Sequence, residues 1–570
     1  MILDNIKNYF RQQIRKYGFR TNSILCHHKS LKAVLIATMF VLTCKAPLYN
    51  GNGNDVKPPV IRVGILEQRN SVEFHLTGKV SFMNRHGSFA LRNLQGGHWR
   101  VEVEKGQPAE FIYRLAIGTT KDRFKAEEIV RSAYDKGLNA QIKKYGRTTD
   151  LSLPYFQKSV YQVLLDKEFR SEDEAKIYQK TIQEKTGSEI IVVPIGVPQG
   201  TLRFTNLDNQ YSFDSKERIR LSTNHIEIID VDVGSGFHWE SRENRIYNGT
   251  LEFVLDNFGL ITVVNELSIE EYLKGVVPSE MPVGFPFEAL KAQAVAARVE
   301  ALAKIGLRHP LEPFDLCDDV HCQVFSGRSR LAESTNRAVE STRGIFMIYR
   351  KKIIEAFYAA VCGGHTENNE NVWLMDAKPY LRGVLDRGGK GSKRLSTSLA
   401  EEMNVKKWID SSPEVFCNTT RKKVPEVLNY SKKYFRWQVP YARKELEGIL
   451  RNKTGEDFGL LLDLVPIKRG ISGRLIELEV VGTKKRFIIR QELAIRQALS
   501  KNTLYSACFY IKKEVGPGNV PRKFVIKGAG WGHGVGMCQI GAAAMALAGK
   551  KFDEILTHYY KGIVLETLYN

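Results

Sequence analysis

The spacing of apolar residues divides the chain into regions with strand-like and helix-like patterns. From residue 60 to about 104, runs such as VIRVGIL and SVEFHLTG are separated by turn residues, which predicts strands. Strand patterns return over residues 201–264 and end in GTLEFVLDNFGLITVVNEL. Ser268 and Glu271 then have the spacing of a capping box, which predicts the start of a helix. The presence of both types of element predicts an α+β fold.

A tandem pair of similar segments lies between the two strand-rich regions. YRLAIGTTKDRFKAEEIVRSAYDKGLNAQIKKYG starts at Tyr113, and YQVLLDKEFRSEDEAKIYQKTIQEKTGSEIIVVP starts at Tyr161. Each predicts strand, helix and strand, so residues 111–195 are expected to form a small inserted α+β module. In size and element order this module resembles the SPOR domain, whose family binds peptidoglycan glycan strands that lack stem peptides. An ordinary inserted module is the alternative.

The N-terminal pattern predicts export. A basic leader containing NYFRQQIRKYGFR precedes an apolar run over residues 33–43, which is shorter than the ~20 residues that a membrane-spanning helix needs. The pattern is typical of a signal peptide, and an uncleaved anchor is the alternative. We therefore expect residues 1–46 to be a signal peptide or anchor and residues 47–58 to be a linker. The expected location is the periplasm or cell envelope, with membrane contact only through this segment.

Composition indicates a globular protein with an anionic partner. Hydrophobic residues make up 43% of the 570 residues and charged residues 26%. The net charge of +21 favours nucleic acid, anionic lipid or an acidic polysaccharide, with general solubility as the alternative. Nucleic acid is disfavoured, because the sequence has no Lys/Arg-rich run with interleaved aromatics and no nucleic-acid-binding motif. The eight cysteines are too sparse for a disulfide scaffold.

One glutamate occupies an unusual position in the segment GVVPSEMPVGFPFEALKAQAVAAR. Pro278 and Pro282 flank Glu280 and predict that it lies in neither a regular helix nor a strand. Met281 precedes a proline and is therefore expected to be extended. Taken by itself, Glu280 could simply cap the helix that follows, because acidic residues stabilise helix N-termini.

The following helix is predicted to be amphipathic, with Pro286 as its first residue and Gly306 at its end. It places Lys291, Val295 and Arg298 at positions i, i+4 and i+7, and hence on one face. Two cations behind a glutamate suit the binding of an anion. Two solvated charges on an exposed helix face are the alternative.

Cysteine and histidine cluster in the segment RHPLEPFDLCDDVHCQ. His309, Cys317, His321 and Cys322 fall within fourteen residues, and these side chains suit tetrahedral zinc. We expect a structural zinc ion on His309, Cys317 and Cys322, with His321 as a substitute ligand. A Cys317–Cys322 disulfide is the competing interpretation in an oxidising compartment.

Two glycine-rich turns carry further candidates. YAAVCGGHTEN predicts a strand that runs into a Gly363–Gly364 turn, with Tyr358 and His365 at its ends. In GWGHGVG, His533 lies between glycines in a tight turn, as is typical of an exposed binding loop. On spacing alone, purely structural turns explain both motifs equally well.

Five blocks in a fixed order resemble the stage II sporulation protein D family, also called the SpoIID/LytB or amidase-enhancer group. They are EEYLKGVVPSEMP, EALKAQAVAAR, FDLCDDVHCQVFSG, FYAAVCGGHTENNENVW and GWGHGVGMCQIGAAAMALAG. The resemblance implies a SpoIID-type α+β fold with its first strands in residues 59–110. It implies that residues 200–570 are the catalytic domain and that residues 111–195 are inserted. Residues 395–520 offer little chemistry to place.

The resemblance implies a lytic transglycosylase that cleaves MurNAc–GlcNAc bonds of peptide-stripped glycan strands and releases 1,6-anhydro-MurNAc products. Glu280 would be its single acid/base, because the C6 hydroxyl of the substrate itself attacks and no second carboxylate is needed. No cofactor is needed for this chemistry. A peptidoglycan amidase acting upstream would expose the lactyl carboxylates that the basic residues hold. The expected substrate-binding residues are Lys291, Arg298, Tyr358, His365 and His533.

Two other functions fit the same sequence. A non-catalytic amidase enhancer would bind glycan and stimulate a partner N-acetylmuramoyl-alanine amidase. A hydrolase would need a second carboxylate near Glu280, and the nearby acidic cluster is Asp315, Asp318 and Asp319.

Overall fold

A large, mainly antiparallel sheet joins the two strand-rich regions of the sequence. The computed structural model describes residues 56–570 except 85, 147–152, 157–158, 183–184, 235–239, 374, 389–396 and 422, all within the unit Asn54–Asn570. The strand order of the sheet is β13-β1-β12-β11-β10-β2-β3-β8-β9. Its strands are β1 (Val60–Arg69), β2 (Ser71–Met83), β3 (Phe89–Gln107), β8 (Gln199–Asn206), β9 (Ser212–Ser215), β10 (Ile219–Val233), β11 (Ser241–Leu255), β12 (Ile261–Ser268) and β13 (Leu316–Cys317).

The predicted inserted module has a sheet of its own. Its elements follow the order β-α-β-β-α-β, and its antiparallel sheet has the strand order β5-β6-β4-β7. A separate apolar core that includes Leu115, Leu165 and Phe169 holds the helices to this sheet. Its similarity to the SPOR domain stays a prediction. The elements are β4 (Phe111–Thr120), α3 (Arg123–Asp135), β5 (Ala140–Gly146), β6 (Ser159–Phe169), α4 (Glu172–Ile182) and β7 (Glu189–Pro194).

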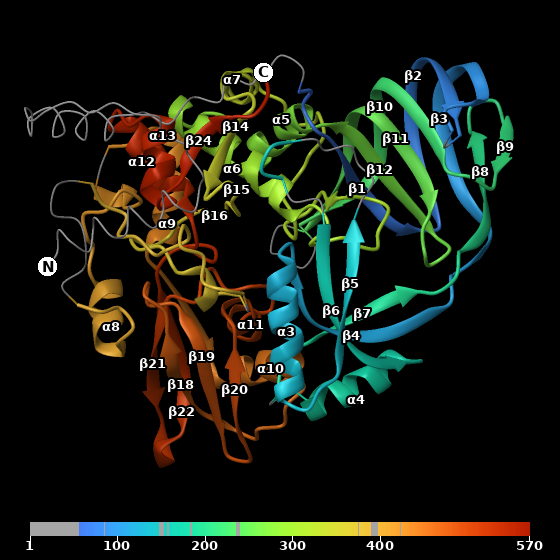
Figure 1. The fold of residues 1–570 in the computed structure, drawn as a ribbon. Helices are drawn as coiled ribbons and strands as arrows, with labels where there is room; N and C mark the ends of the chain where they lie inside the picture. The colour runs from blue at the N-terminus through green and yellow to red at the C-terminus, as the bar shows by residue number, and fades with distance from the viewer. Residues whose placement is uncertain are drawn as a thin grey trace, which may run out of the picture. The chain divides into compact units, whose positions relative to one another are not determined.

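Helix α6 (Phe287–Lys304) lies at the centre of a helical layer beside the large sheet (Figure 1). It packs against four other helices and β14, and its alanine-rich sequence is buried on almost every face. The predicted amphipathic face is therefore absent, because neighbours surround this helix. The remaining elements here are α5 (Ile269–Glu280), α7 (Glu333–Ser341), α12 (Gln539–Leu547), α13 (Phe552–Tyr559), β14 (Ile345–Tyr349), β15 (Lys352–Ile353), β16 (Tyr358–Ala359), β23 (Met537–Cys538) and β24 (Val564–Thr567).

The region for which the sequence predicts no specific chemistry contains two three-stranded sheets, with strand orders β17-β22-β21 and β18-β19-β20. Both contribute to one apolar core with α10 and α11. The elements are α8 (Glu402–Asp410), α9 (Lys432–Phe435), β17 (Trp437–Ala442), α10 (Arg443–Thr454), β18 (Leu461–Arg469), β19 (Leu475–Gly482), β20 (Arg486–Arg490), α11 (Glu492–Ala498), β21 (Phe509–Val515) and β22 (Pro521–Gly528). Short 3-10 helices occur at Asn369–Asn371, Thr419–Arg421, Glu426–Ser431 and Pro517–Asn519.

The predicted signal peptide or anchor, residues 1–46, lies outside the described residues, as does most of the predicted linker. None of the helices in the described ranges is both long and apolar enough to cross a membrane.

Candidate active site

Glu280 is the last residue of α5, so the prediction that it lies outside a regular helix is wrong. Pro278 lies inside the helix, in its final turn, where its missing N–H removes one intrahelical hydrogen bond. Met281, the residue after the helix, is extended with φ −133° and ψ 136°, as its position before a proline predicts. The chain therefore leaves the helix directly after Glu280. Ser268 caps the other end of α5 by accepting a hydrogen bond from the Glu271 N–H, as predicted.

A short polar chain holds the half-buried carboxylate of Glu280. The Val324 N–H donates to its Oε1 at 3.0 Å, and the Tyr358 hydroxyl also hydrogen-bonds to it. The Gln323 amide donates to the Tyr358 hydroxyl at 3.0 Å and accepts from the Tyr272 hydroxyl at 3.2 Å. Three side chains and one backbone N–H, from three segments, therefore fix the orientation of one carboxyl group.

The surroundings of Glu280 favour its protonated form. Burial raises the pKa of Glu280, and the Val324 N–H, the distant charge of Lys304 and the Tyr358 hydroxyl lower that pKa only in part. No cation of the described part of the chain is in ion-pair contact with this carboxylate. Lys304 itself pairs with Glu300 at 3.2 Å. A carboxyl group with a raised pKa can donate a proton nearer to neutral pH than an ordinary glutamate can.

The backbone of Glu280 is held from the C-terminal part of the chain. The Gln539 amide donates to the Glu280 carbonyl oxygen at 3.0 Å and to Gln293 Oε1 at 3.3 Å. Gln539 is the first residue of α12, and Gln293 lies on α6. Sequence reasoning missed both glutamines, because their proximity depends on a contact between residues almost 250 positions apart.

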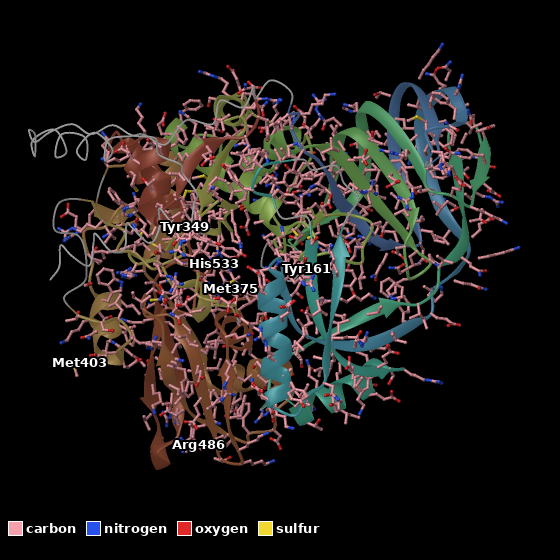
Figure 2. All side chains as sticks on the ribbon, viewed as in Figure 1. Tyr161, Tyr349, Met375, Met403, Arg486 and His533 are labelled. Carbon is pink, nitrogen blue, oxygen red and sulfur yellow. The ribbon has the colours of Figure 1, made fainter. Side chains whose placement is uncertain are left out.

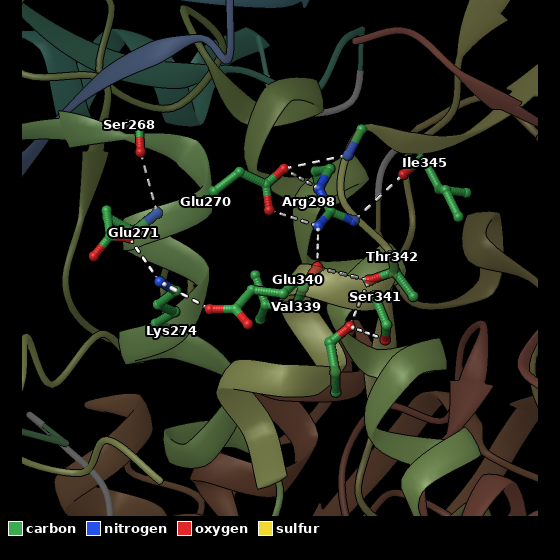
Figure 3. A network of polar contacts seen from close by, with 12 residues as sticks. Ser268, Glu270, Glu271, Lys274, Arg298, Val339, Glu340, Ser341, Thr342 and Ile345 are labelled. Carbon is green, nitrogen blue, oxygen red and sulfur yellow. Dashed lines mark hydrogen bonds and ion pairs between the residues drawn. The ribbon is translucent and has the colours of Figure 1, made fainter. Parts of the chain in front are cut away.

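Arg298 lies in the core, which contradicts its predicted contact with substrate. Its side chain is 0% exposed and forms a bidentate pair with Glu270, at 2.9 and 2.8 Å (Figure 3). It also donates to the carbonyl oxygens of Val339 and Ile345. The prediction failed because α6 is buried on nearly all sides, so a cation on it needs an internal partner.

Lys291, on the same helix, is half-buried rather than fully enclosed. Its ammonium pairs with Glu288 at 3.2 Å and lies 4.4 Å from the ring centroid of Phe552. A role for Lys291 in binding an anion stays a prediction.

His365 is buried and makes an internal hydrogen bond between Nδ1 and the Thr366 carbonyl oxygen, at 2.7 Å. Only 7% of its surface is exposed, which argues against the predicted sugar contact. Arg474 holds this region together, since its guanidinium donates to the carbonyl oxygens of Cys362 and Gly532. Nothing in the sequence near Arg474 signals this role.

His533 lies in the predicted tight turn and is half-buried. Gly534 has φ +77°, and a Cβ there would come within 2.3 Å of Arg474, so glycine is required. Burial lowers the pKa of His533 to about 3, so the ring is neutral, and its Nδ1 accepts from the Val535 N–H at 3.0 Å. The ring centroid lies 4.9 Å from that of Trp373.

An open cavity of about 1100 Å³ adjoins this part of the molecule. Trp373, which contacts His533, lines it, and so does Lys304, whose charge acts on Glu280. Figure 2 labels Tyr349 and Met375, which line the cavity, and His533, which is not part of its wall. Aromatic rings are a frequent part of the lining, as suits a ligand with sugar faces. They are Tyr155, Phe156, Tyr349, Phe357, Trp373 and Tyr380.

The predicted zinc ligands lie together, and His321 belongs to the group as a fourth member. One ligand atom from each of His309, Cys317, His321 and Cys322 falls within 4.8 Å of all the others. Cys322 Sγ lies 3.4 Å from His309 Nε2 and 3.8 Å from His321 Nδ1. Tetrahedral zinc with bonds of about 2.3 Å to sulphur and 2.0 Å to nitrogen requires such separations. Both cysteines are free, so the donor set fits zinc better than a disulfide.

The acidic cluster considered for a hydrolase is engaged elsewhere. Asp315 Oδ2 accepts from the Arg62 N–H at 2.9 Å, and Asp318 pairs with Arg245 at 3.2 Å. Asp319 Oδ1 accepts from the Val320 N–H at 2.7 Å. Because of these contacts, the structure does not support a second catalytic carboxylate in this cluster.

Comparison with known proteins identifies two matching regions. Residues 258–349 match the family described as stage II sporulation protein, and residues 367–536 match a domain of unknown function, DUF8618. An uncharacterized protein of Brachyspira hyodysenteriae (strain ATCC 49526 / WA1) is 33% identical over 362 residues, covering 63% of this chain and 82% of that protein.

Two relatives carry informative names. Stage II sporulation protein D of Bacillus amyloliquefaciens is 31% identical over 315 residues, covering 53% of this chain and 74% of that protein. The amidase enhancer of Bacillus subtilis (strain 168) is 28% identical over 319 residues, covering 51% of this chain but only 40% of that protein. The family match includes Glu280, and the chain is 31% identical to one member over 74% of that protein's length, so the chain belongs to the stage II sporulation protein D family.

Proposed function

We propose that the protein is an exported lytic transglycosylase that remodels the cell wall by cleaving peptide-stripped glycan strands. The observation that carries this proposal is the half-buried Glu280, whose pKa is raised and which has no ion-pair partner among the described residues. Membership of the family, with an amidase enhancer among the relatives, supports a role in cell-wall remodelling. The predicted partners are glycan strands and an amidase that acts before this protein.

In the proposed reaction, protonated Glu280 donates its proton to the oxygen that links MurNAc to GlcNAc. The bond from that oxygen to the anomeric carbon breaks, and the C6 hydroxyl of the same MurNAc attacks the carbon. The Glu280 carboxylate then accepts the hydroxyl proton and returns to its starting state. The products are a 1,6-anhydro-MurNAc end and a free GlcNAc hydroxyl, and no water is consumed.

The neighbours of Glu280 serve this cycle by fixing its orientation. The Val324 N–H stabilises the carboxylate after the first proton transfer, because it donates to Oε1. Tyr358 acts as a positioning residue and is itself held by Gln323. The ring of His533, beside Trp373, is neutral and hydrogen-bonded to the backbone of Val535 and Tyr358, so it shapes this part of the site without adding charge.

His309, Cys317, His321 and Cys322 are proposed to hold a structural zinc ion. When bound, zinc would cross-link this loop, and it would take no part in the reaction. The chain continues directly from Cys322 to Gln323 and Val324, so fixing the loop also fixes two groups that contact the Glu280 site.

A non-catalytic amidase enhancer is the second candidate. The relative that carries this name supports it, and so does the basic charge of the chain. Such a protein would bind glycan in the same cavity and leave it intact.

Mass analysis of products from denuded glycan tests the proposal. The expected product ends in 1,6-anhydro-MurNAc and contains no label when the reaction is run in heavy-oxygen water. A reducing-end MurNAc that carries solvent oxygen would show hydrolysis. Intact glycan, together with faster release of peptides by an added amidase, would show the enhancer.

A further inference from the structure

A second group of metal-binding side chains lies away from the predicted zinc ligands. It consists of Cys362, Asp386, Cys417 and Cys538, and one ligand atom from each lies within 4.8 Å of all the others. All four residues are buried, with at most 2% of their surface exposed. They come from four separate segments, so nothing in the local sequence brings them together. Cys362 follows β16, Cys417 precedes a 3-10 helix, and Cys538 ends β23 and caps α12.

The separation of the sulphur atoms suits a metal ion. Cys362 Sγ and Cys417 Sγ lie 3.5 Å apart. Two sulphurs bound to tetrahedral zinc at about 2.3 Å lie about 3.8 Å from each other, whereas a disulfide needs about 2.05 Å. Three cysteines and one carboxylate are a donor set that zinc accepts.

Backbone N–H groups are directed at two of the sulphur atoms. The Cys362 and Gly541 N–H groups donate to Cys538 Sγ at 3.2 and 3.4 Å, and the Gly364 N–H donates to Cys362 Sγ at 3.4 Å. Gly541 belongs to the first turn of α12, whose partial positive charge also favours an anion at Cys538. These hydrogen bonds orient the two sulphur atoms, as outer partners orient the ligands of known metal sites.

Asp386 is a buried carboxyl group that lacks a cation within the described ranges. Its Oδ1 accepts from the Tyr559 hydroxyl at 2.7 Å, and its Oδ2 accepts from the Cys417 N–H at 2.9 Å. These two hydrogen bonds orient it as outer partners orient the ligands of known metal sites. A buried carboxylate usually has a paired cation or coordinates a metal ion.

We propose that Cys362, Asp386, Cys417 and Cys538 bind a second zinc ion in a buried structural site. The site joins the CGGH and GMCQ segments, which lie far apart in the sequence. Residue Gln539, directly after Cys538, donates to the Glu280 carbonyl oxygen. The second site therefore supports the backbone of Glu280, whereas the loop of the first site supports its carboxylate through Val324.

Metal content of the full chain tests this proposal directly. Cys26 and Cys44 are changed to serine so that only the six described cysteines are present. We expect two zinc ions per chain after dialysis, and one after Cys538→Ser. Cys508→Ser is the matched control, because Cys508 is buried but belongs to neither cluster, and it should retain two. One zinc ion in the parent protein, unchanged by Cys538→Ser, would overturn the proposal.

Cobalt provides a second reading that does not depend on the folding of Cys538→Ser. In the Cys317→Ser/Cys322→Ser variant, which removes two ligands of the first site, added Co²⁺ should give the visible and near-ultraviolet bands of tetrahedral cobalt bound to thiolates. The parent protein should give these bands for two ions. Titration of thiols after denaturation without reductant should find all six described cysteines reduced. Bands for no more than one ion in the parent together with none in the variant, or loss of two thiols to a Cys362–Cys417 disulfide, would refute the second site.

Discussion

Helix α5 carries a glutamate near each end whose side chain is at least partly buried, and the two differ in almost every property that matters for function. Glu270, in the first turn, is 3% exposed and forms a bidentate pair with Arg298. Glu280, at the last position, is half-buried and receives hydrogen bonds from Val324 and Tyr358 but has no ion-pair partner within the described residues. Residue type and helix are the same, so the difference lies in the surroundings: Glu270 is enclosed and paired with Arg298, whereas Glu280 is half-buried and has no ion-pair partner among the described residues.

The two pKa shifts have opposite signs and therefore opposite consequences for stability. Burial alone would raise the pKa of Glu270, but Arg298 and the hydrogen bond from Tyr569 lower it below its ordinary value. Glu270 thus contributes stability above its unfolded pKa and loses that contribution as the pH falls through its folded pKa. The pKa of Glu280 is raised by burial, so its contribution is present below its unfolded pKa and is lost as the pH rises through its folded pKa.

The largest effect is expected from Glu280→Gln, which keeps the shape but cannot donate a proton. Formation of 1,6-anhydro product should fall by about 10²–10⁴-fold, the usual contribution of a general acid–base group. The thermal midpoint near neutral pH should be unchanged or higher, because a buried ionisable group has been removed. Product analysis and calorimetry measure both quantities.

Glu271→Gln is the control, since Glu271 lies on the same helix and, within the described residues, hydrogen-bonds to Asn248, Lys274 and the cap residue Ser268. It should retain full activity. If Glu280→Gln formed as much product as the parent protein, Glu280 would not be the acid–base group, and the functional difference between Glu280 and Glu270 would disappear.

Glu270→Gln should affect stability rather than chemistry. It leaves Arg298 buried without its partner, which costs about 3–5 kcal/mol in the free energy of unfolding. Activity per folded molecule should stay within about twofold, because Glu270 contacts no group of the Glu280 site. Denaturant unfolding and active-site-normalised rates measure the two effects.

The double variant Glu270→Gln/Arg298→Met removes both members of the pair and should recover part of the lost stability. A loss of product formation in Glu270→Gln at full stability would show that both ends of α5 take part in the reaction.

The sequence predicted the α+β class, the capping of α5 by Ser268 and the grouping of His309, Cys317 and Cys322 with His321 nearby. These features depend on local patterns, in which spacing along the chain determines spacing in the structure. It did not predict the role of Arg298. The spacing of a charged residue along a helix does not show whether neighbouring helices and strands cover that face of the helix. Gln539 and Arg474 were missed for a related reason, since their contacts join segments far apart in the chain.

The hydrogen bond from Tyr358 to Glu280 allows a second test of the Glu280 site, through the pKa of this carboxyl group. This bond lowers the pKa of Glu280, so Tyr358→Phe should raise that pKa further. Activity that depends on protonated Glu280 declines as the pH rises through its pKa, so this limb of the pH–rate profile should move to higher pH in the variant. The maximal rate should fall about 10- to 100-fold, as expected when a hydrogen bond of about 1.5–3 kcal/mol to a charged group is lost.

Tyr272→Phe is the matched control, because Tyr272 bonds to Gln323 and not to the carboxylate. Its profile should keep the parent limb. If the high-pH limb of the pH–rate profile moved to lower pH in Tyr358→Phe, the Tyr358 hydrogen bond would not be lowering the pKa of Glu280.

The smallest effect is expected from Lys291→Met, which tests whether the Glu280 end of α5 truly lacks a cation. Lys291 is the nearest cation on α6 in sequence, but it pairs with Glu288 and does not contribute to the pKa shift of Glu280. The pH–rate limb should therefore stay in place, while KM for denuded glycan rises about two- to threefold at low salt, as expected for one partly screened charge. Arg337→Met, which removes an exposed cation from α7, should leave KM unchanged. A limb that moves to higher pH in Lys291→Met would mean that Glu280 has a cationic partner after all, and the contrast with Glu270 would then be one of degree rather than of kind.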